Sequence, residues 1–343
     1  MRAGVKKRTV SCSVGVFLGS LFAISTGFAD NSSPHFISPI DCSVPTECVI
    51  QNYVDARPGT GHRDYACGTL SYERHKGTDF RVLSYDLYRQ GVSVLAAADG
   101  VVVGQGNEAN DDEYILNGDN AVYLQEVGNN VVIDHPNGWQ TTYAHLKKGT
   151  VRVSLGDKVK AGDVIGVVGL SGKTEFPHLH FQLSHNKGVV DPFTGQKPAG
   201  CTVSTENSLW NLPGGKEFEY KDTGIIDTGF AGQPPVQKRL AFHSEQKRLL
   251  VKNDPDLLVF WGEFWGLKIA DRLTVRFKNP KGEIVTEQTS LKDNQASYFK
   301  YVGKKKPKTG WIPGVYTGEI RLERLVNGQW VVVDYRQETH TLQ

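Results

Sequence analysis

Residues 130–145 read NVVIDHPNGWQTTYAH, two runs rich in β-branched and aromatic residues that are separated by Pro136-Asn137-Gly138. Such runs favour strands and Pro-Asn-Gly favours a tight turn, so this stretch predicts a β-hairpin. Short runs of the same kind, broken by Gly, Asn and Asp, recur between residues 68 and 193; they are 92–98, 101–103, 164–168 and 178–183. Helical periodicity is almost absent. We therefore predict an all-β domain, built as an antiparallel sheet or a small barrel.

A second group of strand-like runs follows a break in this pattern. Residues 202–238 have weak periodicity and contain the turn-forming sequence GQPP at 232–235, which predicts a linker. From residue 239 to residue 343 the sequence predicts about seven short strands, with a hairpin turn at Asn327-Gly328. This spacing is typical of an immunoglobulin-like β-sandwich, so the chain is expected to contain two β-domains.

The first 29 residues predict a secretory signal peptide. A basic start is followed by an apolar stretch from Val10 to Ile24 and by small residues up to Ala29, which is the usual three-part pattern. Of the 39 basic residues in the chain, four lie in this segment, so its removal leaves 35 basic and 37 acidic residues. A nearly neutral chain lacks the positive field that attracts nucleic acid, and no nucleic-acid partner is expected. After signal cleavage no integral membrane segment is expected, and the mature chain is predicted to be periplasmic or extracellular.

Export determines how the cysteines are interpreted. The four that remain after signal removal are Cys42, Cys48, Cys67 and Cys201. In an oxidising compartment four thiols predict two disulfides, and three pairings are compatible with the sequence. Every pairing joins Cys201 to a cysteine of residues 30–67. This N-terminal segment is therefore expected to be tied to the end of a first domain at 68–201, as a disulfide brace or as an inhibitory segment.

Histidines of the first β-domain occur at spacings that suit a metal site. His75 and Asp79 are four residues apart, and His178 and His180 are two apart. On extended backbone an even separation puts both side chains on one face of the sheet, so each pair can converge on one point. Two imidazoles and one carboxylate suit a tetrahedral zinc ion that keeps one position for water. The sequence thus predicts an open metal site.

A peptide hydrolase that uses such an ion also needs a proton carrier. His145 is one candidate, and strand alternation puts its side chain on the same face as that of Tyr143. The metal needs only one histidine of the His178/His180 pair, so the other is free to carry protons. The expected site has three ligands and two acid–base groups.

Together these residues resemble the motifs of the lysostaphin/LytM-type zinc metalloendopeptidases, which cleave peptide cross-bridges of bacterial peptidoglycan. The resemblance covers residues 68–193 and rests on six stretches: HKGTD at 75–79, GVSVLAAADGVV at 91–102, VIDHPNG at 132–138, YAHL at 143–146, GDKV at 156–159 and HLHF at 178–181. It implies that His75, Asp79 and His180 hold one Zn2+ per chain. It also implies that His145 and His178 form the catalytic pair and that peptidoglycan peptides are the substrate.

Two stretches depart from the family pattern. The sequence GKTEFP at 172–177 stands where the resemblance leads us to expect a glycine-rich stretch, so the wall formed by this segment is expected to differ. Residues 106–119 look like an inserted acidic loop. Cation binding, coverage of the groove and simple solvation are the alternatives for this loop, and solvation is favoured.

Two other functions stay open on the sequence. Some members of the family have lost ligands and act as non-catalytic regulators, so a wall-binding or regulatory module without turnover is one alternative. A secreted peptidase that acts on a protein substrate is the other. Because all five site residues are present here, we expect an active peptide hydrolase. The C-terminal β-domain contains no cluster of reactive residues and is expected to bind cell wall or a protein partner.

Overall fold

The computed structural model describes residues 1–343 except 2, 5–8, 10–33, 119–125 and 214–217. The predicted signal peptide, residues 1–29, lies outside the described residues but for four positions near its start. The chain divides into two compact units, Met1–Ser32 and Ser33–Gln343, and all described helices and strands belong to the second. Among the described helices, none has both the length and the apolar character needed to cross a bilayer.

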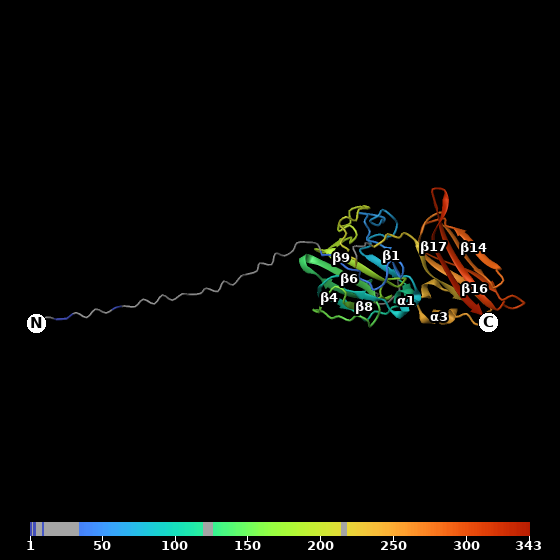
Figure 1. Ribbon diagram of the computed structural model, residues 1–343, viewed down its shortest axis with the longest axis horizontal. Coiled ribbons are helices and arrows are strands. Elements are labelled where there is room, and N and C mark those ends of the chain that lie inside the picture. Colours follow the sequence, from blue (N-terminus) through green and yellow to red (C-terminus); the bar gives the residue numbers. More distant parts are fainter. Residues whose placement is uncertain (2, 5–8, 10–33, 119–125, 214–217) are drawn as a thin grey trace. The chain divides into compact units, whose positions relative to one another are not determined.

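The first part of this unit is built on an antiparallel sheet, as predicted (Figure 1). Neighbouring strands follow the order β1-β2-β9-β6-β5-β4-β7, an open sheet within the described residues, and β10 pairs with β9. A separate two-stranded sheet joins β3 to β8. The strands are β1 (Cys48–Asn52), β2 (Thr78–Val82), β3 (Ser93–Leu95), β4 (Gly100–Gly106), β5 (Asn129–Asp134), β6 (Trp139–Leu146), β7 (Lys158–Val159), β8 (Val164–Val167), β9 (His178–His185) and β10 (Gly188–Val190).

The predicted hairpin at 130–145 is confirmed by the pairing of β5 with β6. Asn137 and Gly138 have φ of 61° and 78°, the left-handed conformation that asparagine and glycine tolerate best. Burial alternates along β5, where Val131 and Ile133 are fully buried. This alternation turns one face of the sheet toward the core and leaves the other face for polar side chains.

The C-terminal part consists of two antiparallel sheets that share a hydrophobic core. One sheet has the order β11-β12-β15 and the other β14-β13-β16-β17. Phe260 and Phe264 from the first sheet are buried in one cluster with Val275, Phe277 and Ile320 from the second. The strands are β11 (Gly224–Ala231), β12 (Leu257–Leu267), β13 (Arg272–Lys278), β14 (Ile284–Ser290), β15 (Gln295–Lys305), β16 (Gly314–Val326) and β17 (Gln329–Leu342).

The segment that the sequence predicted to be a linker is partly strand. Residues 224–231 form β11, which pairs antiparallel with β12 and so belongs to the C-terminal sheets. The prediction missed this strand because Gly224 and Gly229 have no side chain and obscure its apolar pattern. We propose domain limits of 68–201 for the first part and a C-terminal part that begins near residue 224. The immunoglobulin-like topology of the latter stays a prediction.

Short helices and both disulfides complete the described fold. The helices are α1 (Tyr85–Gln90), α2 (Glu113–Asn117) and α3 (His243–Leu249). Cys42 bonds to Cys48, and Cys67 bonds to Cys201. This pairing confirms two disulfides and the predicted link between the N-terminal segment and Cys201.

Candidate metal centre

The pairing of β2 with β9 places two predicted ligands side by side. Asp79 and His180 are direct partners in the register, and Asp79 Oδ1 lies 2.9 Å from His180 Nδ1. Their neighbours Phe80 and Phe181 are fully buried in the core, so alternation turns Asp79 and His180 to the opposite face. The hydrophobic residues of these strands thus fix the face on which the polar pair lies.

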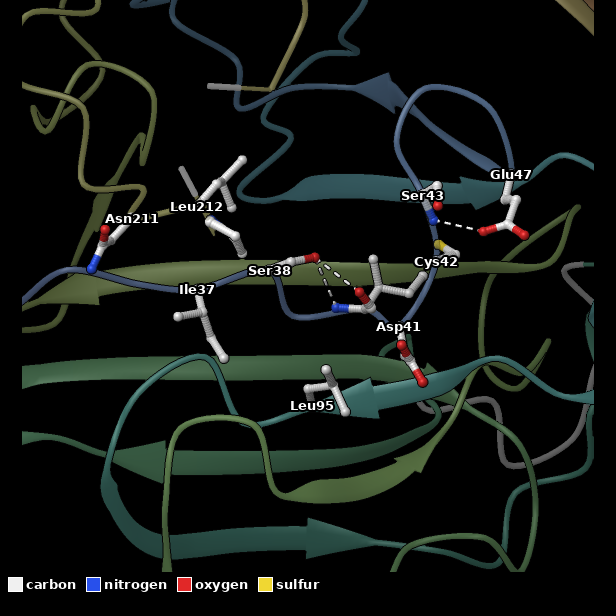
Figure 2. A pocket seen from close by; sticks show the side chains of 11 residues that line it. Ile37, Ser38, Asp41, Cys42, Ser43, Glu47, Leu95, Asn211 and Leu212 are labelled. Atoms are coloured by element: carbon white, nitrogen blue, oxygen red, sulfur yellow. Dashed lines mark hydrogen bonds between the residues drawn. The ribbon is translucent and has the colours of Figure 1, made fainter. Parts of the chain in front are cut away.

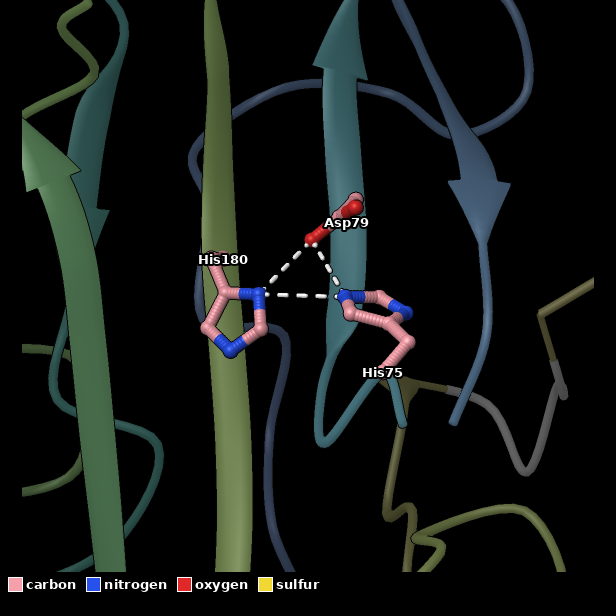
Figure 3. Close-up of side chains that lie close together, drawn as sticks. All are labelled: His75, Asp79 and His180. Carbon is pink, nitrogen blue, oxygen red and sulfur yellow. Dashed lines mark hydrogen bonds and ion pairs between the residues drawn. The ribbon is translucent and has the colours of Figure 1, made fainter. Parts of the chain in front are cut away.

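His75 reaches the same point from a turn, not from a strand. It precedes β2, and Arg74 before it has φ of 65°. Figure 3 shows its ring directed at the Asp79–His180 pair: His75 Nε2 lies 3.1 Å from Asp79 Oδ1 and 3.2 Å from His180 Nδ1. Gly77 makes this approach possible, because a Cβ there would lie 2.6 Å from the His180 ring.

A hydrogen bond determines which ring nitrogen of His75 carries the hydrogen and which one faces Asp79 with a lone pair. Its Nδ1 lies 2.7 Å from the carbonyl oxygen of Tyr53, which can only accept, so Nδ1 carries the hydrogen. The Nε2 of the neutral ring then directs a lone pair at the carboxylate of Asp79. Two acceptors that face each other in a buried site repel unless a cation lies between them.

The pKa shifts of the two groups agree with a site for positive charge. Burial acts to raise the pKa of Asp79, but the neighbouring His75 and His178 hold it well below its ordinary value. Burial acts to lower the pKa of His75, but the charge of Asp79 and a hydrogen bond with it raise it. Asp79 therefore stays ionised, and its negative charge attracts a cation.

The three donor atoms fit a tetrahedral metal ion. Their separations of 2.9, 3.1 and 3.2 Å form a nearly equilateral triangle. A tetrahedral ion with bonds of about 2.0–2.1 Å has ligand-to-ligand edges of about 3.3–3.4 Å, so a small outward shift of each atom accommodates it. His75, Asp79 and His180 are the group within the described residues that could hold a metal ion.

His145 lies beside this cluster, although not by the strand alternation that was predicted. Tyr143 packs against Phe181 in the core, and its hydroxyl accepts a hydrogen bond from Ala97 N at 2.8 Å. The His145 ring instead lies on the opposite face, with its centre 5.9 Å from that of His180. The prediction that His145 and Tyr143 share a face is therefore wrong. His145 has φ of 62°, which reverses the side-chain direction at the end of β6.

A backbone carbonyl also sets the tautomer of His145. Its Nδ1 lies 2.8 Å from the carbonyl oxygen of Ser171, so Nδ1 donates and Nε2 keeps a lone pair. Burial and the nearby His178 and His180 lower the pKa of His145 well below its ordinary value. His145 is therefore a neutral imidazole with an available acceptor at neutral pH.

His178 completes the group of imidazoles. Its ring centre lies 4.7 Å from that of His145, and its Nε2 lies 3.6 Å from Asp79 Oδ1. Its Nδ1 lies 3.0 Å from the carbonyl oxygen of Phe176 and 3.1 Å from Thr174 Oγ1. Burial lowers its pKa. The structure therefore brings all five predicted site residues together on one face of the sheet.

Sequence reasoning missed the residues that hold these side chains in place. Asn52 Nδ2 donates to Asp79 Oδ2 at 3.1 Å, and Asp55 accepts from the backbone N–H of Arg74 at 2.9 Å. Asp55 also donates its own N–H to the carbonyl oxygen of His75 at 2.8 Å. These contacts come from the N-terminal segment, some twenty residues before the metal cluster, and no motif marks them. The pairing of β1 with β2 brings Asn52 to the site, and the segment that follows β1 carries Asp55 to the backbone of Arg74 and His75.

Comparison with known proteins agrees with this geometry. Residues 73–192 match Peptidase family M23. This M23 segment contains all five site residues, and the match confirms the resemblance predicted from their motifs.

Parts of the chain are similar to curated relatives and to a solved structure. Peptidoglycan DD-endopeptidase ShyA of Vibrio cholerae is 36% identical over 145 residues, which are 42% of this chain and 28% of that protein. An uncharacterized metalloprotease of Buchnera aphidicola is 33% identical over 118 residues, 34% of this chain and 25% of that protein. The catalytic domain of lysostaphin from Staphylococcus simulans is 28% identical, with 39% of this chain and 86% of that chain covered and a TM-score of 0.26. The chain spans about a quarter of the length of these two curated relatives.

A hollow on the described surface lies apart from the metal cluster. Figure 2 shows side chains that line it, which come from the N-terminal segment, Leu95 and the stretch 211–213. Its volume is about 690 Å³. None of the five site residues lines it. Its two carboxylates are Asp41 and Glu47, and Glu47 accepts a hydrogen bond from the backbone N–H of Ser43. The hollow therefore offers no converging set of reactive groups.

Proposed function

We propose that the chain is an exported, zinc-dependent endopeptidase that hydrolyses peptide bonds in peptidoglycan cross-links. One observation carries the proposal: three metal-binding side chains, His75, Asp79 and His180, meet beside two further imidazoles. Two nitrogen donors and one carboxylate leave a tetrahedral ion one open position, which is the arrangement of catalytic zinc sites. A closed structural site uses four protein ligands.

The ion and the protein have separate tasks in this proposal. Bound zinc acidifies water and polarises a carbonyl oxygen. His75 and Asp79 are oriented for binding by Tyr53 and Asn52, whose hydrogen bonds limit the directions their donor atoms can take. Both side chains are almost fully buried, at 3% and 1% exposure, which excludes competing water from their donor atoms.

His145 and His178 are proposed as the proton carriers. Each directs Nε2 away from the carbonyl oxygen that holds its Nδ1, so each neutral ring can accept a proton from an attacking water. The imidazolium formed can then donate its proton to the leaving amine. Burial keeps both rings neutral before the reaction by lowering the pKa of each.

The proposed substrate is supported by the relatives, and the proposed compartment is supported by the disulfides. Two of the curated relatives are named peptidoglycan DD-endopeptidases, and both are more than 30% identical to this chain over the matched residues. The disulfides Cys42–Cys48 and Cys67–Cys201 are typical of an oxidising compartment, which favours export to the periplasm or beyond. We further propose that the C-terminal sheets contribute to contact with the wall or with a partner protein.

Digestion of isolated peptidoglycan sacculi tests this function. The mature protein is loaded with zinc and incubated with sacculi, with and without a chelator, and the released muropeptides are separated by chromatography. We expect loss of cross-linked species that the chelator prevents, and no loss with His145→Ala. Muropeptide profiles that stay unchanged with the zinc-loaded protein would contradict the proposal.

A further inference from the structure

The strand β12 presents one charged residue on an otherwise apolar face. Val259, Trp261 and Trp265 of this face belong to the same hydrophobic cluster as Phe80 and Phe181 of the M23 segment. The alternate residues Leu258, Phe260 and Phe264 belong to the core between the two C-terminal sheets. Glu263 lies at the centre of the first face and is 2% exposed. A carboxylate at such a position is costly unless it is paired.

The partner of Glu263 comes from the strand that carries the metal ligand Asp79. Arg81 Nη2 donates to Glu263 Oε1 at 3.0 Å, and Arg81 is itself 1% exposed. Glu263 also accepts from the Tyr85 hydroxyl at 2.6 Å and from Gln237 Nε2 at 2.9 Å. Arg81 Nη1 donates to Gln51 Oε1 at 2.8 Å. The pair is therefore fully enclosed, with polar groups from both parts of the chain around it.

Arg81 lies directly beside the proposed catalytic histidine. It is the register partner of His178 in the β2–β9 pair. Its guanidinium carbon lies 4.4 Å from the centre of the Phe176 ring, a cation–π contact. The Phe176 ring centre lies 4.7 Å from that of His178, and the Phe176 carbonyl oxygen holds His178 Nδ1. A continuous set of contacts thus connects Glu263 to His178.

Stability of the fold alone does not explain why the pair of Arg81 and Glu263 is charged. Buried ion pairs add little net stability, because the loss of hydration offsets most of the attraction, and apolar residues of similar size often replace them without loss. The direction of the guanidinium, by contrast, depends on the carboxylate that it faces. Glu263 is the residue of β12 that bonds to Arg81, and Gln51 of β1 accepts from the other terminal nitrogen of the guanidinium.

We propose that Glu263 is a positioning residue for His178 that acts through Arg81 and Phe176. The C-terminal sheets then complete the catalytic site of the M23 segment and are not only an appended binding module. This inference rests on the proposed function, because it takes His178 to be catalytic.

The double substitution Arg81→Met/Glu263→Met tests the inference. It removes both charges together, so no unpaired charge stays buried and folding is expected to persist. Glu263→Gln is a second variant that keeps the shape and removes only the charge. The matched control is Arg272→Met/Glu323→Met, which removes an ion pair between β13 and β16 that does not contact the M23 segment.

Three readouts separate positioning from stability. Bound zinc is measured by elemental analysis, kcat and KM are measured on a purified cross-linked muropeptide dimer, and the Nδ1–H resonance of His178 is followed by NMR on protein with 15N-labelled histidine. That resonance is assigned by its absence in His178→Ala. We expect unchanged zinc and KM, a kcat that is lower by about 10- to 100-fold, and a broadened or lost His178 resonance. Glu263→Gln is expected to show the same changes to a smaller extent, and the control variant none.

Either of two results would overturn the inference. One is a double variant with the kcat and the His178 resonance of the original protein. The other is a lower kcat with an intact resonance, because the loss would then not pass through His178. If the original protein does not cleave the dimer, the proposed function fails, and the NMR comparison still tests whether Glu263 orients His178.

Discussion

Asn52 and Asp79 are direct partners across the β1–β2 pair, and Asn52 Nδ2 donates to Asp79 Oδ2 at 3.1 Å. The other carboxylate oxygen, Oδ1, is the one that faces His75 and His180. Asn52 thus binds the carboxylate oxygen that points away from the two histidines and limits rotation of the carboxylate. The N-terminal segment is in this way part of the metal centre's support.

This relationship predicts that Asn52→Ala weakens zinc binding. The carboxylate loses its orienting hydrogen bond, and such losses typically lower metal affinity by about 10- to 100-fold. Competition with a chromophoric chelator at neutral pH measures the affinity. Asn253→Ala is the control, since Asn253 donates only to Gln343 near the end of the chain. Equal affinity in both variants would show that Asn52 does not support the site.

The proposed ligands and the proposed proton carriers should separate by metal content. His75→Ala and Asp79→Ala each remove one of three donor atoms, so zinc bound after desalting should fall strongly. His145→Ala removes no donor atom and should keep the zinc while sacculus digestion is lost. Elemental analysis of the three variants, side by side with digestion, makes the comparison. Similar zinc loss in all three would mean that the roles are wrongly divided.

Zinc affinity should fall as the pH is lowered, because a protonated imidazole cannot ligate. The pKa of His75 in the metal-free site is raised by Asp79, so protons begin to compete with zinc above the ordinary histidine pKa of about 6.5. The pKa of Asp79 is lowered, so its carboxylate stays ionised and does not contribute to this fall. Chelator competition at several pH values tests the sign. An affinity that is constant between about pH 5 and pH 8 would exclude imidazole ligands.

The two disulfides should differ in their effect on stability. Cys67–Cys201 joins residues 134 apart, whereas Cys42–Cys48 joins residues six apart. In the chain-entropy model, the longer loop makes the first bridge more stabilising by roughly 2–3 kcal/mol. Urea unfolding of Cys67→Ser/Cys201→Ser and of Cys42→Ser/Cys48→Ser measures the two losses. A larger loss for the short-range pair would contradict this expectation.

Asp227 of β11 should make stability depend on pH between about 4 and 6. Burial raises its pKa to about 6, although it accepts hydrogen bonds from the backbone N–H groups of Tyr85 and Thr228. The native state then binds the proton more tightly than the unfolded chain, whose aspartate pKa is about 3.9. The stability from this proton is present below about pH 4 and is lost as the pH rises through about 6.

Asp227→Asn removes this titration. The free energy of unfolding of the original protein falls as Asp227 ionises, and that of the variant does not. The difference, variant minus original, should therefore increase by roughly 2 kcal/mol when the pH is raised from about 4.5 to about 7.5. Urea unfolding of both proteins at the two pH values gives this difference in free energy of unfolding. The contributions of the other titrating groups are the same in both proteins and cancel. A difference that does not change with pH would show that Asp227 is ionised in both states.

Strand alternation predicted part of the site and failed where the backbone departs from it. His178 and His180 are two residues apart on β9, so their spacing was sufficient to place them on one face. The spacing of His75 and Asp79 was not, because His75 lies outside β2; Asp79 reaches the site through the pairing of β2 with β9. His75 reaches the same point through a turn that follows the positive φ of Arg74, and His145 does so through its own positive φ. The sequence motifs identified His75 and His145 as site residues, but strand alternation did not predict the directions of their side chains.

Long-range pairing explains what the sequence could not indicate. Asn52, Ser171 and Phe176 act through a side-chain amide or backbone carbonyls, which no residue pattern marks. Glu263 is more than 180 residues from Arg81, and its isolated charge in an apolar strand was the one available signal. The predicted all-β class was confirmed, while β11 was missed because glycines obscured its pattern.

X-ray absorption at the zinc edge of the loaded protein measures the ligands of the ion itself. We predict one zinc per chain with two imidazoles and one carboxylate among its ligands, and nitrogen or oxygen neighbours at about 2.0–2.2 Å. His180→Ala should lower the imidazole count to one, and His145→Ala should leave the spectrum unchanged. A spectrum with sulfur neighbours, or one that responds to His145→Ala and not to His180→Ala, would contradict the proposed metal centre.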